Sequence, residues 1–181
     1  MMLLAETIIN KYYNNNLLAK NILLTHSKLV RDKAVWIANR NPHLNANLEL
    51  LELGSMLHDI GILFTHAPDI GCNGPHPYIC HGYLGRELLE LEGLNKIALF
   101  AERHTGTGLT VETIKAQNLP VPHREMVPVT IEEQIICFAD KFYSKGKHPE
   151  CEIPIEKTRK KLTKHGIEQV EQFNKWCEIF L

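Results

Sequence analysis

The sequence predicts an all-α protein, a helical bundle. Apolar residues recur at steps of three and four in several segments, which is the spacing of one face of a helix. No segment shows convincing strand alternation, and Gly- and Pro-rich stretches separate the periodic segments. A chain of 181 residues can bury one sizeable core, whereas a second domain would be small. We therefore expect one domain over residues 1–181, with its core at about 18–143 and C-terminal helices over 154–181.

The first predicted helix spans residues 17–40 and ends at an Asn-Pro dipeptide, because the residue before a proline is disfavoured in the α region. His26 lies on its apolar face. The next predicted helix spans about 47–58, and Gly54 within it would allow a neighbouring element to approach closely. We expect His26 and His58 to meet where these two helices pack.

An irregular segment follows at residues 62–78, which are rich in Gly and Pro. Long loops inside compact domains are often lids or binding edges, so we expect this segment to cover a site. His66 and His76 lie in it and either touch substrate or metal or are solvated loop residues. Four other histidines have no helical or motif context and are expected on the surface: His43, His123, His148 and His165.

Helical periodicity returns at residues 79–91 and 94–104, with His81 and His104 on the core-facing sides. Residues 105–129 are expected to be irregular, apart from a short helix at 111–118.

A capping box begins the following helix, with Thr130 as the cap and Glu133 three residues later. Asp140 lies on the buried face of this helix and therefore needs a partner. Two further helices complete the chain, one beginning at Pro154 and one with an ordinary packing face over residues 167–180.

Composition excludes several classes of protein. The net charge is −1 and the N-terminus is too quickly charged for a signal peptide, so we expect a cytoplasmic protein without a membrane or nucleic-acid polymer as partner. The basic run at residues 159–164 is interpreted as a solvated helix face. Five cysteines without a Cys-x-x-Cys pair predict free thiols. The oligomeric state stays open.

The chemistry-bearing residues form one recurring pattern. Buried imidazoles and carboxylates must be paired, neutralised or bound to metal, and helical bundles build metal sites from side chains that point inward from several helices. Mixed nitrogen and oxygen ligands favour Fe, Mn, Zn, Co or Ni over Ca. The adjacent pair His58-Asp59 can reach one site only where its helix ends, and Gly61 would make that bend inexpensive. The pattern comprises six residues: His26, His58, Asp59, His81, His104 and Asp140.

This ordered set, with His58-Asp59-Ile60-Gly61 intact, resembles the HD superfamily of metal-dependent phosphohydrolases, specifically its HDIG group. The resemblance covers about residues 18–143. It implies a helical domain with one or two divalent metals per chain and Asp59 bridging them. By the same resemblance the first metal would be held by His26, His58, Asp59 and Asp140, and the second also by His81 and His104.

Two branches of the superfamily differ in how closely this sequence matches them. The cyclic-dinucleotide branch has Lys after HDIG and a pair of adjacent histidines, whereas here position 62 is Ile and Thr105 follows His104. The diadenosine-tetraphosphate hydrolases share the six-ligand pattern and the approximate size, so they are a closer analogue.

The predicted function is metal-dependent hydrolysis of a small phosphorylated substrate such as a nucleotide or dinucleotide. Asp59 would act as the shared metal ligand. Arg103 and Lys141, each next to a predicted ligand, would neutralise phosphate oxygens, unless they are structural or surface residues. Two alternatives stay open: a di-iron oxygenase of the same superfamily, and a non-catalytic module that binds a nucleotide or metal.

Overall fold

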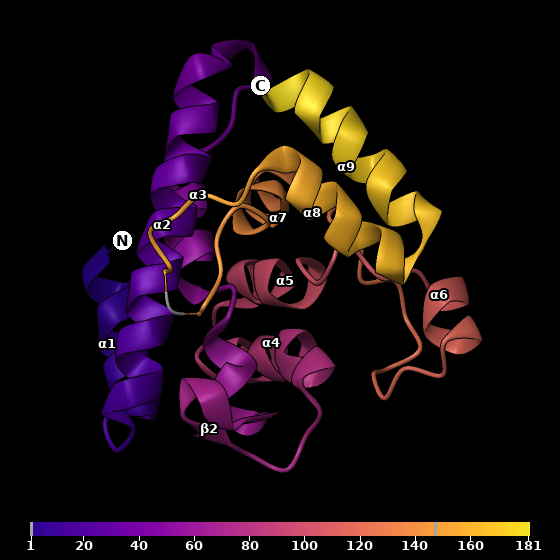
Figure 1. Cartoon of the computed structure of the whole chain (residues 1–181). Coiled ribbons are helices and arrows are strands. Elements are labelled where there is room, and N and C mark those ends of the chain that lie inside the picture. Colours follow the sequence, from indigo (N-terminus) through magenta and orange to yellow (C-terminus); the bar gives the residue numbers. More distant parts are fainter. Residues whose placement is uncertain (1, 147) are drawn as a thin grey trace.

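The computed structural model describes residues 2–146 and 148–181 and confirms the predicted all-α class (Figure 1). The helices α2 (Leu17–Arg40), α3 (Leu48–Leu57) and α7 (Ile131–Asp140) pack together at the centre. The helices α4 (His81–Leu91) and α5 (Asn95–Arg103) pack against each other, and α5 also contacts α3 and α7. None of the described helices is both long and apolar enough to cross a membrane.

The C-terminal helices lie along one side of this bundle (Figure 1). Helix α8 (Ile155–Leu162) leads through the short helix η5 (Thr163–His165) into α9 (Ile167–Phe180). Aromatic rings of α9 and α7 pack together, with Phe138 and Phe173 centred 5.2 Å apart. The predicted packing face of the last helix is therefore confirmed. Asn41 at the end of α2 donates its side-chain N–H to the Phe180 carbonyl and holds the end of α9.

Several helix ends agree closely with the sequence. Asn47 caps α3 by accepting the Leu50 N–H, and Thr130 caps α7 by accepting the Glu133 N–H. In a capping box the Glu133 carboxylate would accept the N–H of Thr130 itself, but here it accepts the N–H of Val129. The predicted short helix is α6 (Val111–Ala116).

Helix α1 (Met2–Tyr13) was not assigned from the sequence. Its last residue, Tyr13, is fully buried, and the Tyr13 hydroxyl donates to the Ile60 carbonyl and accepts the Leu63 N–H. These bonds hold the short helix η2 (Ile60–Phe64), which directly follows the His-Asp pair. Helix α1 therefore supports the segment that carries Asp59.

The segment expected to be irregular contains more structure than predicted. A small hairpin joins β1 (His66–Ala67) to β2 (Cys72–Asn73), with η3 (Pro68–Ile70) between them. The Gly71 carbonyl accepts a bond from the Asn16 side chain, and the Gly74 N–H bonds to Thr65. A side-chain bond from Asn16 and backbone bonds within the segment therefore hold it in place, and its role as a lid stays a prediction.

Two glycines are placed by close packing. A Cβ on Gly54 would lie 2.8 Å from Ile136 Cδ1, which confirms the predicted close approach of a neighbour. A Cβ on Gly61 would lie 2.1 Å from the His81 carbonyl oxygen. Gly61 is not among the glycines with positive φ, so it is required by contact with α4 and not by the expected freedom to bend.

Candidate metal centre

The six predicted ligands come together from five helices or helix ends. His26 lies within α2, and His58 and Asp59 follow the last residue of α3. His81 begins α4 after the short helix η4 (Tyr78–Cys80). His104 follows the end of α5, and Asp140 is the last residue of α7. Five of the six therefore lie at helix ends, where side chains can turn inward, and only His26 lies within a helix.

Asp59 is the carboxylate that the ligand groups share. Its Oδ2 lies 3.2 Å from the Nε2 of both His26 and His58. Its Oδ1 lies 3.5 Å from His81 Nε2 and 3.4 Å from His104 Nε2. The two oxygens of one buried side chain thus face two different groups of imidazoles.

These atoms form two candidate sites. In each, the ligand atoms all lie within 4.8 Å of one another. The first consists of His26, His58, Asp59 and Asp140, and the second of Asp59, His81 and His104. Either group could hold a divalent cation.

Backbone carbonyls orient three of the imidazoles. The Nδ1–H of His58 donates to Ser55, that of His81 to Tyr78 and that of His104 to Ala101, each three residues earlier, at 2.6–2.7 Å. The Nε2 lone pairs therefore point into the site. Outer hydrogen bonds of this kind fix the tautomer and orientation of metal-binding histidines.

Several ligand atoms are buried without a hydrogen bond among the described residues: His58 Nε2 and both oxygens of Asp59. Buried polar atoms are normally satisfied. The Lys145 ammonium lies near Asp59 Oδ2, whereas His58 Nε2 and Asp59 Oδ1 face other imidazole and carboxylate atoms of the site. A cation would satisfy them together. The donor set, imidazole nitrogens with carboxylate oxygens, fits a divalent transition metal.

Charge in the site shifts the pKa values strongly. Burial alone would raise the pKa of Asp59, but the nearby Lys145 ammonium and His58 lower it well below its usual range. Burial would lower the pKa of His58, yet Asp59 and Asp140 outweigh burial and raise it to about 9. Burial, reinforced by His104, lowers the pKa of His81 to about 3, so this imidazole is neutral and free to act as a ligand.

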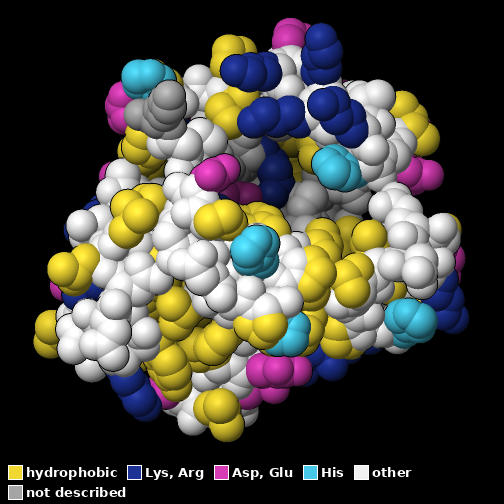
Figure 2. Space-filling model, turned by 60° about the horizontal axis from the view of Figure 1, so that its bottom comes forward, with side chains coloured by type: hydrophobic (Ala, Val, Ile, Leu, Met, Phe, Trp, Pro, Cys, Tyr) yellow, Lys and Arg dark blue, Asp and Glu magenta, His cyan; other side chains and the backbone are white. Residues whose placement is uncertain are grey.

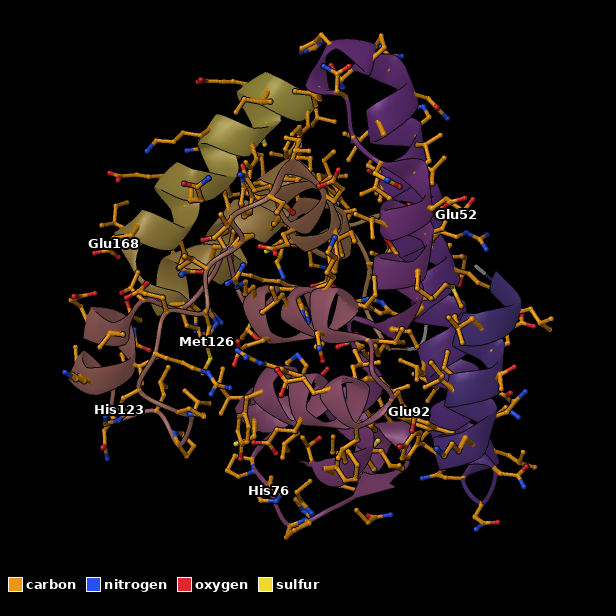
Figure 3. All side chains as sticks on the ribbon, turned by 180° about the vertical axis from the view of Figure 1, so that it is seen from behind. Glu52, His76, Glu92, His123, Met126 and Glu168 are labelled. Carbon is orange, nitrogen blue, oxygen red and sulfur yellow. The ribbon has the colours of Figure 1, made fainter. Side chains whose placement is uncertain are left out.

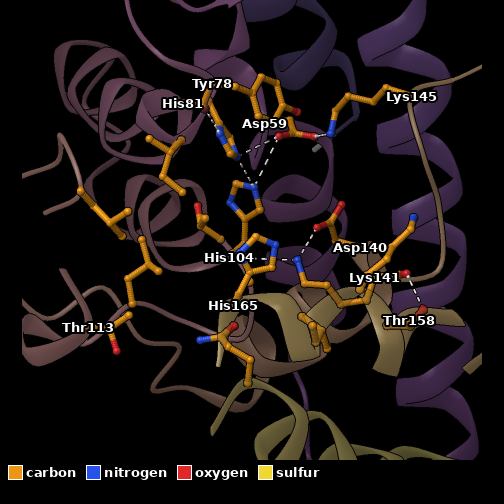
Figure 4. Close-up of a pocket in the computed structure, with 18 of the residues that line it drawn as sticks. Asp59, Tyr78, His81, His104, Thr113, Asp140, Lys141, Lys145, Thr158 and His165 are labelled. Atoms are coloured by element: carbon orange, nitrogen blue, oxygen red, sulfur yellow. Dashed lines mark hydrogen bonds and ion pairs between the residues drawn. The ribbon is translucent and has the colours of Figure 1, made fainter. Parts of the chain in front are cut away.

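Two lysines flank the carboxylates (Figure 4). Lys141 Nζ lies 2.6 Å from Asp140 Oδ2 and donates to the His104 carbonyl. Lys145 Nζ lies 2.5 Å from Asp59 Oδ2. Lys145 was not predicted as a site residue, because it lies on no apolar helix face and is not part of the motif. Only its position five residues after Asp140 places it near the site.

The other predicted phosphate-binding residue, Arg103, lies elsewhere. Its guanidinium bonds to both carboxylate oxygens of Glu133 at 3.0 Å, and it does not line the cavity described below. This pairing links α5 to α7. The geometry therefore favours the structural alternative for Arg103.

A cavity of about 510 Å³ opens beside the cluster (Figure 4). Asp59, His81, His104 and Asp140 lie at one end, with both flanking lysines. Tyr78 also lines it, and burial raises the pKa of its hydroxyl to about 12, so that it remains a hydrogen-bond donor at neutral pH. The volume is within the range of small-molecule sites.

Part of the remaining wall of the cavity comes from the loop after His104 and from α9. Gln169 is buried, accepts the Thr107 N–H at 2.6 Å and donates to the Gly108 carbonyl at 2.8 Å. It thereby fixes the loop that starts at a metal-ligand candidate. The sequence analysis assigned α9 to packing alone and did not identify this contact.

The histidines expected outside the site lie at the surface or on loops. Figure 3 labels His76 and His123 at the periphery of the molecule. His43, His123 and His148 are exposed, as predicted. His165 is exposed too but lines the mouth of the cavity, which its sequence context did not indicate.

Comparison with known proteins places the chain in a family. A protein of Methanocaldococcus jannaschii without an assigned function is 35% identical over 153 residues, which cover 83% of this chain and 82% of that protein. Two proteins named tRNA (cytidine(56)-2'-O)-methyltransferase, from Thermoplasma volcanium and Picrophilus torridus, are 30% and 33% identical over 90% and 70% of this chain. The alignments cover only 44% and 33% of those two proteins. No solved structure matches at a significant level.

The family model described as HD domain matches residues 23–144, more than half of the chain. This range contains both candidate ligand groups, whose residues span His26 to Asp140. The chain belongs to the HD-domain family.

Proposed function

We propose that this protein is a metal-dependent phosphohydrolase that cleaves a phosphate ester or anhydride of a nucleotide or dinucleotide. The observation that carries the proposal is the position of Asp59, whose two oxygens face two separate ligand groups. A shared carboxylate between adjacent cation sites is the arrangement expected for hydrolysis at two metals. Membership of the HD-domain family supports it.

His26, His58, Asp59 and Asp140 would hold one cation, and Asp59, His81 and His104 a second. When bound, Fe, Mn, Zn, Co or Ni lowers the pKa of bound water and neutralises charge on phosphoryl oxygens. The protein contributes the orientation of the donors, since three imidazoles are held by carbonyls of their own helices or turns.

Lys141 and Lys145 would bind the phosphate group. Both ammonium groups line the cavity next to the ligand carboxylates. Burial opposes their charged forms, but Asp140 raises the pKa of Lys141 and Asp59 that of Lys145, so both stay cationic at neutral pH. Each flexible side chain can turn from its carboxylate towards a phosphate oxygen, for which an ammonium is a mobile point charge. Tyr78 can donate a further hydrogen bond from the same wall.

Two relatives are named for methyl transfer to tRNA, and this chain spans less than half of each. We propose that the shared segment is a hydrolytic unit of its own, because its site consists of metal ligands and lysines. A substrate of nucleotide character is compatible with these relatives.

The test is phosphate release from a panel of nucleotides, dinucleotides and simple phosphate esters. Protein would be loaded with each candidate metal and assayed with and without oxygen. We expect oxygen-independent release, reduced at least about 1,000-fold by Asp59→Asn and unaffected by Asp32→Asn, a matched change at an exposed residue of α2. Turnover only with oxygen, or metal binding without any turnover, would contradict the proposal.

A further inference from the structure

The cavity has a second end, built by α8 and η5. Lys161, Leu162 and His165 line the same cavity as the metal-ligand candidates. The Thr158 hydroxyl of α8 donates to the Lys141 carbonyl at 3.2 Å, which fixes this helix to the segment after Asp140. The basic run interpreted as a solvated helix face therefore also contributes residues to the cavity.

The charge of the lining exceeds what one phosphate group balances. Its acidic residues are Asp59 and Asp140, against three ammonium groups from Lys141, Lys145 and Lys161. One positive charge remains before any metal is considered, and each divalent cation would add two. A phosphate monoester carries at most two negative charges, so the filled cavity would retain positive charge towards its mouth.

Two further lysines, Lys157 and Lys164, lie close to Lys161 in the sequence. Lys157 and Lys161 are four residues apart on α8 and therefore share one side of that helix, and Lys164 follows in η5. In the described chain no carboxylate forms an ion pair with any of the three, whereas Arg159 on α8 is paired with Glu156 and bonded to Asn174. Figure 2 shows Lys and Arg side chains gathered along one edge of a hollow.

Lys161 is exposed at the edge of the cavity, next to another lysine. Burial, with repulsion from Lys157, lowers the pKa of Lys161, although Asp140 partly opposes this. Lysines at the C-terminal end of a helix interact favourably with the helix dipole. The dipole does not explain why Lys161 lines the cavity, or why these lysines form no ion pair with a carboxylate of the described residues. An anion between Lys157 and Lys161 would relieve their repulsion.

We propose that Lys161 and His165, with Lys157 one turn before Lys161 on α8, form a second phosphate subsite, so that the preferred substrate carries at least one phosphate group beyond the one at the metals. This rests on the proposed function for the first phosphate. The substrate class is then a nucleotide with a phosphoanhydride chain or a phosphorylated oligonucleotide end, and a simple monophosphate ester is a poor substrate.

The test compares the binding of two ligands by calorimetry to metal-loaded protein: AMP, and α,β-methylene-ADP, which adds one phosphonate and resists hydrolysis. Elemental analysis after each titration confirms that the metal is retained. We expect wild type to bind the ADP analogue at least about tenfold more tightly than AMP. The double variant K157Q/K161Q should weaken the analogue about tenfold and AMP less than about twofold.

The control is K96Q/K175Q, which removes the same charge from exposed lysines of α5 and α9 and should change neither affinity. Equal affinities of wild type for the two ligands, or an equal loss in the control, would overturn the subsite. Discrimination by Lys157 and Lys161 without phosphate release from any substrate would retain the subsite and refute the proposed hydrolysis. Phosphate release by a protein that binds AMP and the ADP analogue equally would retain the proposed hydrolysis and refute the subsite. A 5'-phosphorylated diadenylate is titrated in parallel. Whichever of this ligand and the ADP analogue loses more affinity in K157Q/K161Q is the kind of ligand that the subsite prefers.

Discussion

Gly61→Ala should disrupt both the fold and the second candidate cation site. The added Cβ would lie 2.1 Å from the His81 carbonyl oxygen, 2.4 Å from the Gly85 nitrogen and 2.8 Å from the Gly85 Cα. Cβ atoms essentially never come closer than 3.0 Å to another heavy atom. Because all three neighbours are backbone atoms, no side-chain rotation can make room. The start of α4 must move away from η2 by roughly an ångström.

The magnitude follows from that displacement. Overpacking a well-packed core costs typically 1–3 kcal/mol, and a backbone clash belongs at the upper end, so we expect a loss of about 3 kcal/mol or more in the free energy of unfolding. His81 begins the displaced helix and is a candidate ligand of the second site. The variant should therefore also lose affinity for a second cation while the first site, which does not include His81, is less affected.

Two glycine variants provide controls. Gly85→Ala would place its Cβ 3.2 Å from the Ala101 Cβ, a tight contact that should cost about 1 kcal/mol. Gly93→Ala would meet nothing within 4 Å, and only its positive φ of 73° makes it unfavourable, by about 1 kcal/mol. Urea unfolding and metal titration would be measured on all three. Wild-type stability and metal content in Gly61→Ala would refute the packing argument.

Three further outcomes are expected. Gln169→Ala leaves the Thr107 N–H and the Gly108 carbonyl without their partner, so urea unfolding should show a loss of about 2–4 kcal/mol in the free energy of unfolding. The control Gln172→Ala, on the same helix, should lose less than about 0.5 kcal/mol. Equal losses in the two variants would contradict this role of Gln169. Lys145→Met should retain metal but lower kcat/KM for hydrolysis by about 10- to 100-fold, and unchanged kinetics would remove Lys145 from the site. In metal-free protein the pKa of His58, about 9, exceeds its unfolded value near 6.5, because Asp59 and Asp140 outweigh burial. Its stabilising contribution is therefore fully present below pH 6.5 and is lost as the pH rises through about 9; unfolding free energies that do not fall over this range would contradict the assignment.

The helical framework could be predicted because its physical signals are local. Periodicity and capping identified α2, α3 and α7 to within about a residue at most ends, and Gly54 was correctly expected to mark a close contact. The six candidate ligands could be found for the same reason, since a buried imidazole or carboxylate on an apolar face is costly without a partner. The structure brings all six together.

What could not be predicted depends on contacts between distant segments. Lys145 and Gln169 have no unusual neighbours in the sequence, and only the tertiary fold places them at Asp59 and at the loop after His104. Helix α1 has no motif, yet Tyr13 supports η2 through two hydrogen bonds. Gly61 was correctly marked as important but for the wrong physical reason, because the constraint is a helix 20 residues later in the chain and not the local bend.

The central claim is that Asp59 joins two cation sites. The most direct measurement is the metal content per chain, by elemental analysis after loading and desalting, of wild type, His81→Ala and Asp59→Ala. We predict about two equivalents in wild type, about one in His81→Ala, where only the second ligand group is altered, and little or none in Asp59→Ala, where both groups lose their shared carboxylate. Circular dichroism would confirm that each variant is folded. Full occupancy in folded Asp59→Ala would contradict the account.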